Sequence, residues 1–268
     1  MVHISAGTAA LVAAIMLGRR RDFGRAPLRP HNVVFTLTGA ALLWVGWIGF
    51  NAGSALAADG VAAMALVNTF AAGAAALLAW LTIEFVHGGQ ATAVGAATGA
   101  VVGLVAITPA AGFVTPLASL AIGAVGAGAS YAALQWRSKT AIDDALDVFA
   151  CHGVAGIVGA VLTGVFASKA VNSAGADGLL YGNPALLGVQ LIAVAATMVF
   201  VAPVTALVLW PLKAVGSLRV PLTDELSGVD VSEHGEHAYD DGEMSALAGS
   251  GQPLGKPVVI ATARERAA

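Results

Sequence analysis

Long apolar stretches, separated by short segments that hold nearly all of the charge, constrain this chain more than any other feature. About 20 apolar residues are enough for a helix to cross the hydrocarbon core of a bilayer. Hydrophobic residues make up 57% of the 268 residues and charged residues only 11%, against about 25% charged in a soluble domain. The sequence therefore predicts an all-α polytopic membrane protein with about seven transmembrane helices, at roughly residues 2–18, 33–51, 62–85, 93–108, 116–136, 147–167 and 185–213. The 93–108 stretch is short, so a half-buried helix is the alternative there.

Composition also excludes several classes of function. Cys151 is the single cysteine, so the chain cannot form an internal disulfide, and no Cys/His cluster has the spacing of a zinc site. No basic patch with interleaved aromatic residues suggests nucleic acid binding. We therefore expect no cofactor, no metal and no nucleic acid partner.

The distribution of Lys and Arg predicts the orientation, because cytoplasmic loops retain positive charge. Five arginines follow the first span, namely Arg19, Arg20, Arg21, Arg25 and Arg29. Placing their loop inside and alternating along seven spans puts all of the 13 Lys and Arg residues except Lys169 on the cytoplasmic side. We expect a multi-pass protein of the cytoplasmic membrane with a cytoplasmic C-terminus.

The apolar pattern ends near residue 216, which predicts two parts. Residues 1–216 form the membrane domain, and residues 217–268 form an acidic cytoplasmic tail that is rich in Gly and His between Asp224 and Glu243. We expect the tail to be available to partners and to be disordered after about residue 240.

An internal echo links the first and sixth spans. His3-Ile-Ser-Ala-Gly7 matches His152-Gly-Val-Ala-Gly156, and each His-x-x-Ala-Gly is followed by a small-residue apolar helix. Ionisable residues inside membrane spans are costly and usually functional, and a matched pair in two halves resembles a transporter repeat. The structural alternatives are an exposed terminal side chain for His3 and a histidine bonded to a backbone carbonyl for His152.

The second span ends in Trp44, Trp47, Phe50, Asn51 and Ser54, with its aromatic residues at helical spacing. An interfacial aromatic belt would explain this pattern, and so would an apolar constriction whose aromatic mouth attracts cations. Two further positions have mainly structural interpretations: Asp147 as the N-terminal cap of the sixth helix, and Thr108-Pro109 as a helix stop.

Taken in order, these segments resemble the ammonium transporter and Rhesus family. The matching motifs in the membrane part are His3-Ile-Ser-Ala-Gly7, Arg29-Pro-His-Asn32, Gly46-Trp-x-Gly-Phe-Asn-Ala-Gly-Ser54, Val67-Asn-Thr69, Gly99 to Gly103, Thr108-Pro-Ala-Ala-Gly112 and Asp147-Val-Phe-x-x-His-Gly-Val-x-Gly-Ile-Val-Gly159. The tail adds Leu218-Arg-Val-Pro221, Gly228-Val-Asp230 and His234-Gly-Glu-x-Ala-Tyr239. Each motif is weak alone, and their order and spacing make the match specific.

The resemblance implies a homotrimer of eleven-helix subunits, each with a pore between two inverted five-helix repeats. The resemblance pairs the seven predicted spans with family helices five to eleven, and we therefore expect helices one to four to be missing from this chain. We expect either a native gene that extends upstream of Met1 or a broken copy, and therefore a partial transporter domain.

The resemblance also implies roles for individual residues. His3 and His152 match paired pore histidines, Phe50 one of two gate phenylalanines, Trp47 a pore wall, and Ser54 an outer recruitment site. Asn68 and Thr108 lie in pore-adjacent motifs. A PII-type nitrogen regulatory protein is the partner implied for the tail, through Arg219, Asp230, His234, Gly235, Glu236 and Tyr239.

The function that follows is transport of ammonium or ammonia, with methylammonium as an analogue, through a hydrophobic pore with a paired-histidine proton relay. The protein is then not an enzyme. The alternative is a transport-inactive remnant or an ammonium sensor that binds a PII-type protein. An intramembrane serine hydrolase pairing Ser54 with His152 is disfavoured, because Gly53-Ser54-Ala55 lacks the Gly-x-Ser-Gly of rhomboid-like proteases.

Overall fold

The computed structural model describes residues 1–25, 30–216 and 218–237, and every regular element in those residues is helical. The chain divides into a unit of residues Met1–Val215 and a unit of residues Gly216–Ala268, which we describe separately. The prediction of an all-α fold is confirmed for the described part of the chain.

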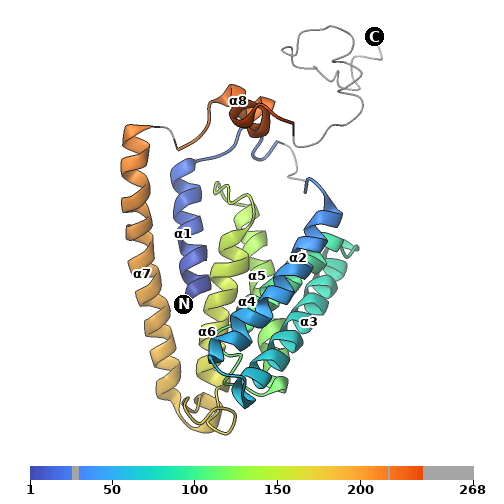
Figure 1. The fold of residues 1–268 in the computed structure, drawn as a ribbon, viewed down its shortest axis with the longest axis vertical. Helices are drawn as coiled ribbons and strands as arrows, with labels where there is room; N and C mark the ends of the chain where they lie inside the picture. The colour runs from blue at the N-terminus through green and yellow to red at the C-terminus, as the bar shows by residue number, and fades with distance from the viewer. Residues whose placement is uncertain (26–29, 217, 238–268) are drawn as a thin grey trace. The chain divides into compact units, whose positions relative to one another are not determined.

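The described residues of the first unit form seven apolar helical segments (Figure 1). They are α1 (Val2–Leu17), α2 (Val33–Trp47), α3 (Gly60–Gly88), α4 (Ala93–Ile107), α5 (Pro116–Ser138), α6 (Ala155–Phe166) and α7 (Pro184–Val215). A π-helix (Ile48–Ala52) and a 3₁₀ turn (Gly53–Ala55) extend α2, and a second π-helix (Phe149–Val154) leads into α6. Among the described residues, five of the resulting helices are long and apolar enough to cross a membrane, whereas α1 and α4 are shorter.

Side-chain caps define where four of these helices begin. Asn32, Asp59, Thr92 and Thr115 each accept hydrogen bonds from backbone N–H groups in the first turn of the helix that follows. These groups have no partner within the helix, and so the caps supply one. The left-handed Gly89 (φ 75°) ends α3, as is common at helix C-termini.

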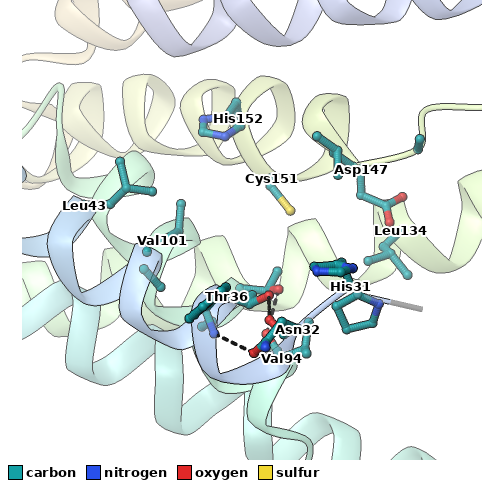
Figure 2. A pocket seen from close by; sticks show the side chains of 18 residues that line it. His31, Asn32, Thr36, Leu43, Val94, Val101, Leu134, Asp147, Cys151 and His152 are labelled. Atoms are coloured by element: carbon teal, nitrogen blue, oxygen red, sulfur yellow. Dashed lines mark hydrogen bonds between the residues drawn. The ribbon is translucent and has the colours of Figure 1, made fainter. Parts of the chain in front are cut away.

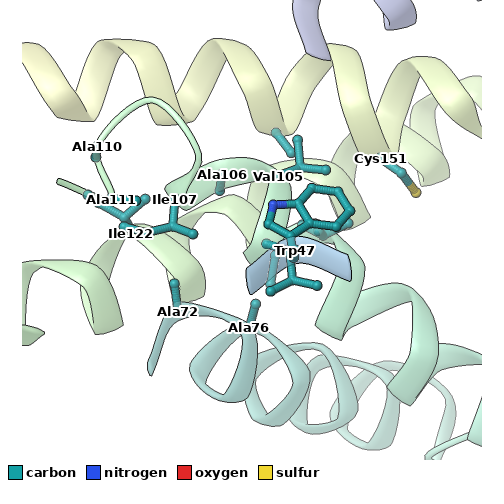
Figure 3. Close-up of a cluster of buried hydrophobic side chains, with 14 of the residues drawn as sticks. Trp47, Ala72, Ala76, Val105, Ala106, Ile107, Ala110, Ala111, Ile122 and Cys151 are labelled. Carbon is teal, nitrogen blue, oxygen red and sulfur yellow. The ribbon is translucent and has the colours of Figure 1, made fainter. Parts of the chain in front are cut away.

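Small residues let α3, α4 and α5 pack closely. Gly123 of α5 lies on the backbone of Ala72 in α3, where a Cβ atom would come 2.9 Å from the Ala72 carbonyl carbon. Gly103 of α4 meets the same turn of α3. Membrane helices associate through such contacts, because lipid gives them no hydrophobic drive to pair. Trp47, Ala72, Ala76, Val105 and Ile107 belong to the buried cluster that results (Figure 3).

The short helix α4 is the most enclosed of the seven. Ten of its 15 residues are buried, and the side chains of Val102, Leu104 and Val105 have no exposed surface. The segment at 93–108 is therefore a helix surrounded by other helices, and its shortness reflects a position inside the bundle.

The α1 helix packs against α7, the π-helix before α6, and α6 itself, and it lies beside α7 in Figure 1. Ile4 joins Ala160 and Val194 in a second buried cluster. Beyond α1, Arg20 reaches the segment between α5 and α6, where its guanidinium pairs with Asp143 at 3.3 Å and its backbone N–H donates to the same carboxylate at 2.8 Å.

Candidate functional site

The two histidines of the sequence echo meet where α1 passes the π-helix Phe149–Val154. The ring centroids of His3 and His152 lie 5.8 Å apart and their planes differ by 23°. His3 is buried, with 9% of its surface exposed, and His152 is half-buried. Two segments separated by almost 150 residues thus place two imidazole rings side by side.

Two glycines permit this approach, and their contacts are reciprocal. A Cβ atom on Gly7 would collide with the backbone of Gly153 and come 3.3 Å from the carbonyl carbon of His152. A Cβ atom on Gly156 would come 3.1 Å from Cβ of His3 and 3.2 Å from the backbone nitrogen of Ile4. Gly7 and Gly156 are the matched glycines of the echo. Each packs against the histidine-bearing turn of the other segment, so the two segments cross symmetrically.

Replacing Gly7 with alanine is therefore expected to push α1 away from the π-helix and to separate the histidines. Overpacking of this kind costs about 1–3 kcal/mol. The unfolding temperature in detergent should fall, and any conductance that depends on the histidine pair should fall with it.

Gly128→Ala in α5 is the matched control, because a Cβ atom there meets nothing within 4 Å. Alanine is the better helix former, so this variant should be as stable as the parent or slightly more so. Equal behaviour of the two variants would show that the close crossing does not hold the histidines together.

Aromatic side chains from the end of α2 surround His3. The Trp47 ring stacks on it with centroids 5.4 Å apart and planes 9° apart, and the Phe50 ring lies 5.5 Å away at 47°. The ring centroids of Trp47 and Phe50 are 5.6 Å apart. These two rings contact the histidine, which favours the interpretation as an apolar constriction over that of an interfacial belt.

Each of the two π-helices described in the first unit carries a candidate residue. The π-helical conformation itself was not expected from the sequence at either place. One holds the candidate Phe50, and the other holds the candidate His152. Single π turns are frequent at functional sites, because they shift side chains out of α-helical register. Their altered period leaves no recognisable signal in segments so rich in Ala and Gly.

The helix cap expected from Asp147 comes instead from Asp144. The buried Asp144 carboxylate accepts the backbone N–H of Phe149 at 2.8 Å. Asp147 adopts a left-handed backbone conformation (φ 53°) and forms an ion pair with Arg137 at the end of α5, at 2.5 Å. The prediction for Asp147 was therefore wrong, because the chain turns between the two aspartates and directs Asp147 towards α5.

The remaining candidates of the membrane part are held by hydrogen bonds. The fully buried Asn68 donates through Nδ2 to the carbonyls of Ala111 and Val114, both at 2.7 Å. Thr108 accepts the indole N–H of Trp47 at 3.0 Å. The hydroxyl of Ser54 donates to the carbonyl of Phe50 at 2.5 Å, so its proton is directed to the backbone, which counts against a serine nucleophile paired with His152.

A pocket of about 840 Å³ reaches His152 from the side of Asn32, at the start of α2 (Figure 2). Cys151, Asp147 and His31 also line it. His3 is not among its lining residues.

In the second unit, Arg219 forms a bidentate ion pair with Glu225. Its Nε lies 2.9 Å from Oε2 and its Nη2 lies 2.6 Å from Oε1. Asp230 and His234 begin and end a π-helical turn that closes at the left-handed Gly235 (φ 70°). The backbone N–H of Glu236 donates to the carbonyl of Asp230 at 3.4 Å. Tyr239 lies outside the described residues, as does the part of the tail that we expect to be disordered.

A bundle of apolar helices in which two adjacent histidines meet, with a tryptophan and a phenylalanine against one of them, defines the class as a multi-pass membrane protein. The sequence model described as Ammonium Transporter Family matches residues 1–239. The chain belongs to the ammonium transporter family.

Individual relatives agree with this assignment. The ammonium transporter of Bacillus subtilis is 48% identical over 242 residues, covering 90% of this chain and 59% of the relative, and that of Aquifex aeolicus is 52% identical over 241 residues, covering 90% and 56%. The chain thus spans less than two thirds of the length of these relatives.

Solved structures give the same fold. The crystal structure of Saccharomyces cerevisiae Mep2 matches with a TM-score of 0.74 and 36% identity, covering 80% of this chain and 50% of that one. A structure titled Sensor Amt Protein matches with a TM-score of 0.78 and 32% identity, covering 87% and 58%.

Proposed function

We propose that this chain carries out ammonium transport by moving ammonia through the apolar passage at His3 and His152, while the two histidines take up and pass on the proton. The family assignment supports ammonium as the substrate, with methylammonium as its analogue. The adjacency of the two imidazole rings beside Phe50 and Trp47 is the observation that carries the mechanism.

The physical reason is the cost of charge in a dry passage. An ammonium ion stripped of its hydration shell in a low-dielectric environment is strongly destabilised. Breaking one N–H bond gives the proton to an imidazole nitrogen and leaves ammonia, which is small and uncharged and can cross the apolar section. The two histidines pass that proton along, and ammonia recovers it on the far side. Histidine suits this exchange because its unperturbed pKa of about 6.5 lies near physiological pH.

Residues near the histidine pair supply the remaining parts of the proposal. Phe50 restricts water beside His3, and the end of the extended α2 at Ser54 gathers the cation on the outer side. Asn68 and Thr108 act through the backbone and side chains that they hold, as their hydrogen bonds indicate.

The charge distribution and the family assignment support a proposal for the oligomeric state and for the orientation in the membrane. We propose a homotrimer in the cytoplasmic membrane, with residues 1–216 in the bilayer and residues 217–268 in the cytoplasm. The tail, with Arg219, Asp230 and the stretch from His234 to Tyr239, would meet a PII-type regulatory protein. The similarity to a structure titled Sensor Amt Protein is compatible with a signalling partner.

Reconstituting the chain into vesicles tests the proposal directly. When a methylammonium gradient is imposed, labelled methylammonium should enter these vesicles faster than it enters protein-free vesicles, as measured by rapid filtration. A folded chain that gives only the protein-free rate would contradict transport. Tail-dependent binding of a PII-type protein by such a chain would then support the sensor alternative.

A further inference from the structure

A chain of hydrogen bonds and ring contacts runs from the end of α4 to His3. The Thr108 hydroxyl donates to the carbonyl of Leu104 at 2.8 Å and accepts the indole N–H of Trp47 at 3.0 Å. The indole ring in turn lies parallel to the imidazole of His3. Three segments far apart in sequence are thus joined, with Thr108 at one end and a proposed relay histidine at the other.

The direction of these hydrogen bonds makes the Thr108 hydroxyl an acceptor towards Trp47. A hydroxyl has one hydrogen to donate, and the indole N–H can donate but cannot accept. Because the hydroxyl hydrogen is used on Leu104, the oxygen is free to accept from Trp47, and the arrangement cannot be reversed. Trp47 is 8% exposed, so its N–H would lose its partner in an apolar environment if the hydroxyl were removed, which is costly.

The ring geometry explains why the angle of Trp47 matters. The plane of the His3 ring is nearly parallel to that of Trp47, at 9°, whereas it makes angles of 47° with Phe50 and 23° with His152. The parallel stack with Trp47 is therefore the contact that most restricts the tilt of the His3 ring. An indole free to turn about its side-chain torsions would let that ring tilt, and with it the direction of its nitrogens towards His152.

We propose that Thr108 is a positioning residue of the proton relay: its hydroxyl fixes the plane of Trp47, and Trp47 fixes the plane of His3. The inference rests on the function proposed above, and it assigns to Thr108 an action through Trp47 without contact with the transported molecule. It differs from the interpretation of Thr108-Pro109 as a simple helix stop, for which a hydroxyl facing Trp47 is not needed.

Thr108→Val tests the inference, because valine keeps the branched shape and removes the hydroxyl. We expect the maximal rate of methylammonium uptake into vesicles to fall about tenfold, as for loss of one buried hydrogen bond that orients a reacting group, with KM within about twofold of the parent. Thr108→Ser keeps the hydroxyl and should restore the rate to within about twofold.

Two measurements separate this role from general destabilisation. The indole N–H resonance of Trp47, assigned by its absence in Trp47→Phe, should move in Thr108→Val and stay in place in Thr108→Ser. In a double-mutant cycle, Thr108→Val should cause no further loss of rate in the Trp47→Phe background, because the bond is already absent.

Equal losses from Thr108→Val in both backgrounds would overturn the inference, as would a moved indole resonance with an unchanged rate. Absence of uptake by the parent chain would instead contradict the proposed function, and the NMR comparison would still report whether Thr108 holds Trp47.

Discussion

Ammonium conductance in vesicles containing His152→Ala is expected to fall by about 100-fold or more, to the protein-free rate. A residue that transfers protons contributes about 10²- to 10⁴-fold to a rate. Without the second imidazole, a proton taken up at His3 has no adjacent ring to receive it, since the ring of His152 lies 5.8 Å from that of His3. The stack of His3 on Trp47 should survive, because it does not involve His152.

His87→Ala is the matched control. His87 lies in the last turn of α3, where its ring is 5.8 Å from that of Tyr131 and makes no ring contact with the histidine pair. Conductance should stay near that of the parent, and both variants should unfold near the parental temperature. Uptake of ammonium or methylammonium that survives His152→Ala would rule out the paired-histidine mechanism.

The largest effect on stability is expected from Asn68→Asp. The two substituents are nearly identical in size, but the carboxylate has no hydrogen to give to the carbonyls of Ala111 and Val114. Both carbonyls would lose their bonds, and a negative charge would face them at a position with 0% exposure. An uncompensated buried charge costs about 3–5 kcal/mol, a large part of a typical total of about 5–15 kcal/mol. We expect little folded protein after detergent extraction.

Asn172→Asp makes the same substitution where only the side-chain oxygen is used, to accept the backbone N–H of Ala174 at 3.1 Å. It should leave the unfolding temperature unchanged. Asn68→Ala removes the two bonds without adding charge and should lie between the two aspartate variants. Equal unfolding temperatures for Asn68→Asp and Asn172→Asp would mean that Asn68 does not hold the turn between α4 and α5.

The membrane helices could be predicted because apolar length is a property of the sequence itself. The expected span at 116–136 is α5 (Pro116–Ser138), and that at 185–213 is α7 (Pro184–Val215). Thr115 and Pro116 mark the start of α5 by known cap preferences. The adjacency of His3 and His152 also had a sequence signal, the repeated His-x-x-Ala-Gly, although only the structure shows that Gly7 and Gly156 make the crossing.

Other parts of the site depend on geometry that the sequence does not express. Asp144 and Asp147 are three residues apart, and nothing in the pattern says which one caps the following helix. Their difference arises from the left-handed backbone of Asp147 and its ion pair with Arg137. The bond from Trp47 to Thr108 joins residues 61 positions apart, and neither residue alone suggests the other as a partner.

The contacts of α1 also determine when the site can assemble during synthesis. Arg20 pairs with Asp143, which is 123 residues further along the chain. At about 5–20 residues per second, a ribosome needs about 6 to 25 s to make that segment. With the proposed placement of residues 1–216 in the bilayer, α1 remains there for that time before the π-helix, α6 and α7 emerge to pack against it. The histidine pair is therefore one of the last features of the membrane unit to form, and an insertion defect in α6 or α7 would leave His3 without its partner.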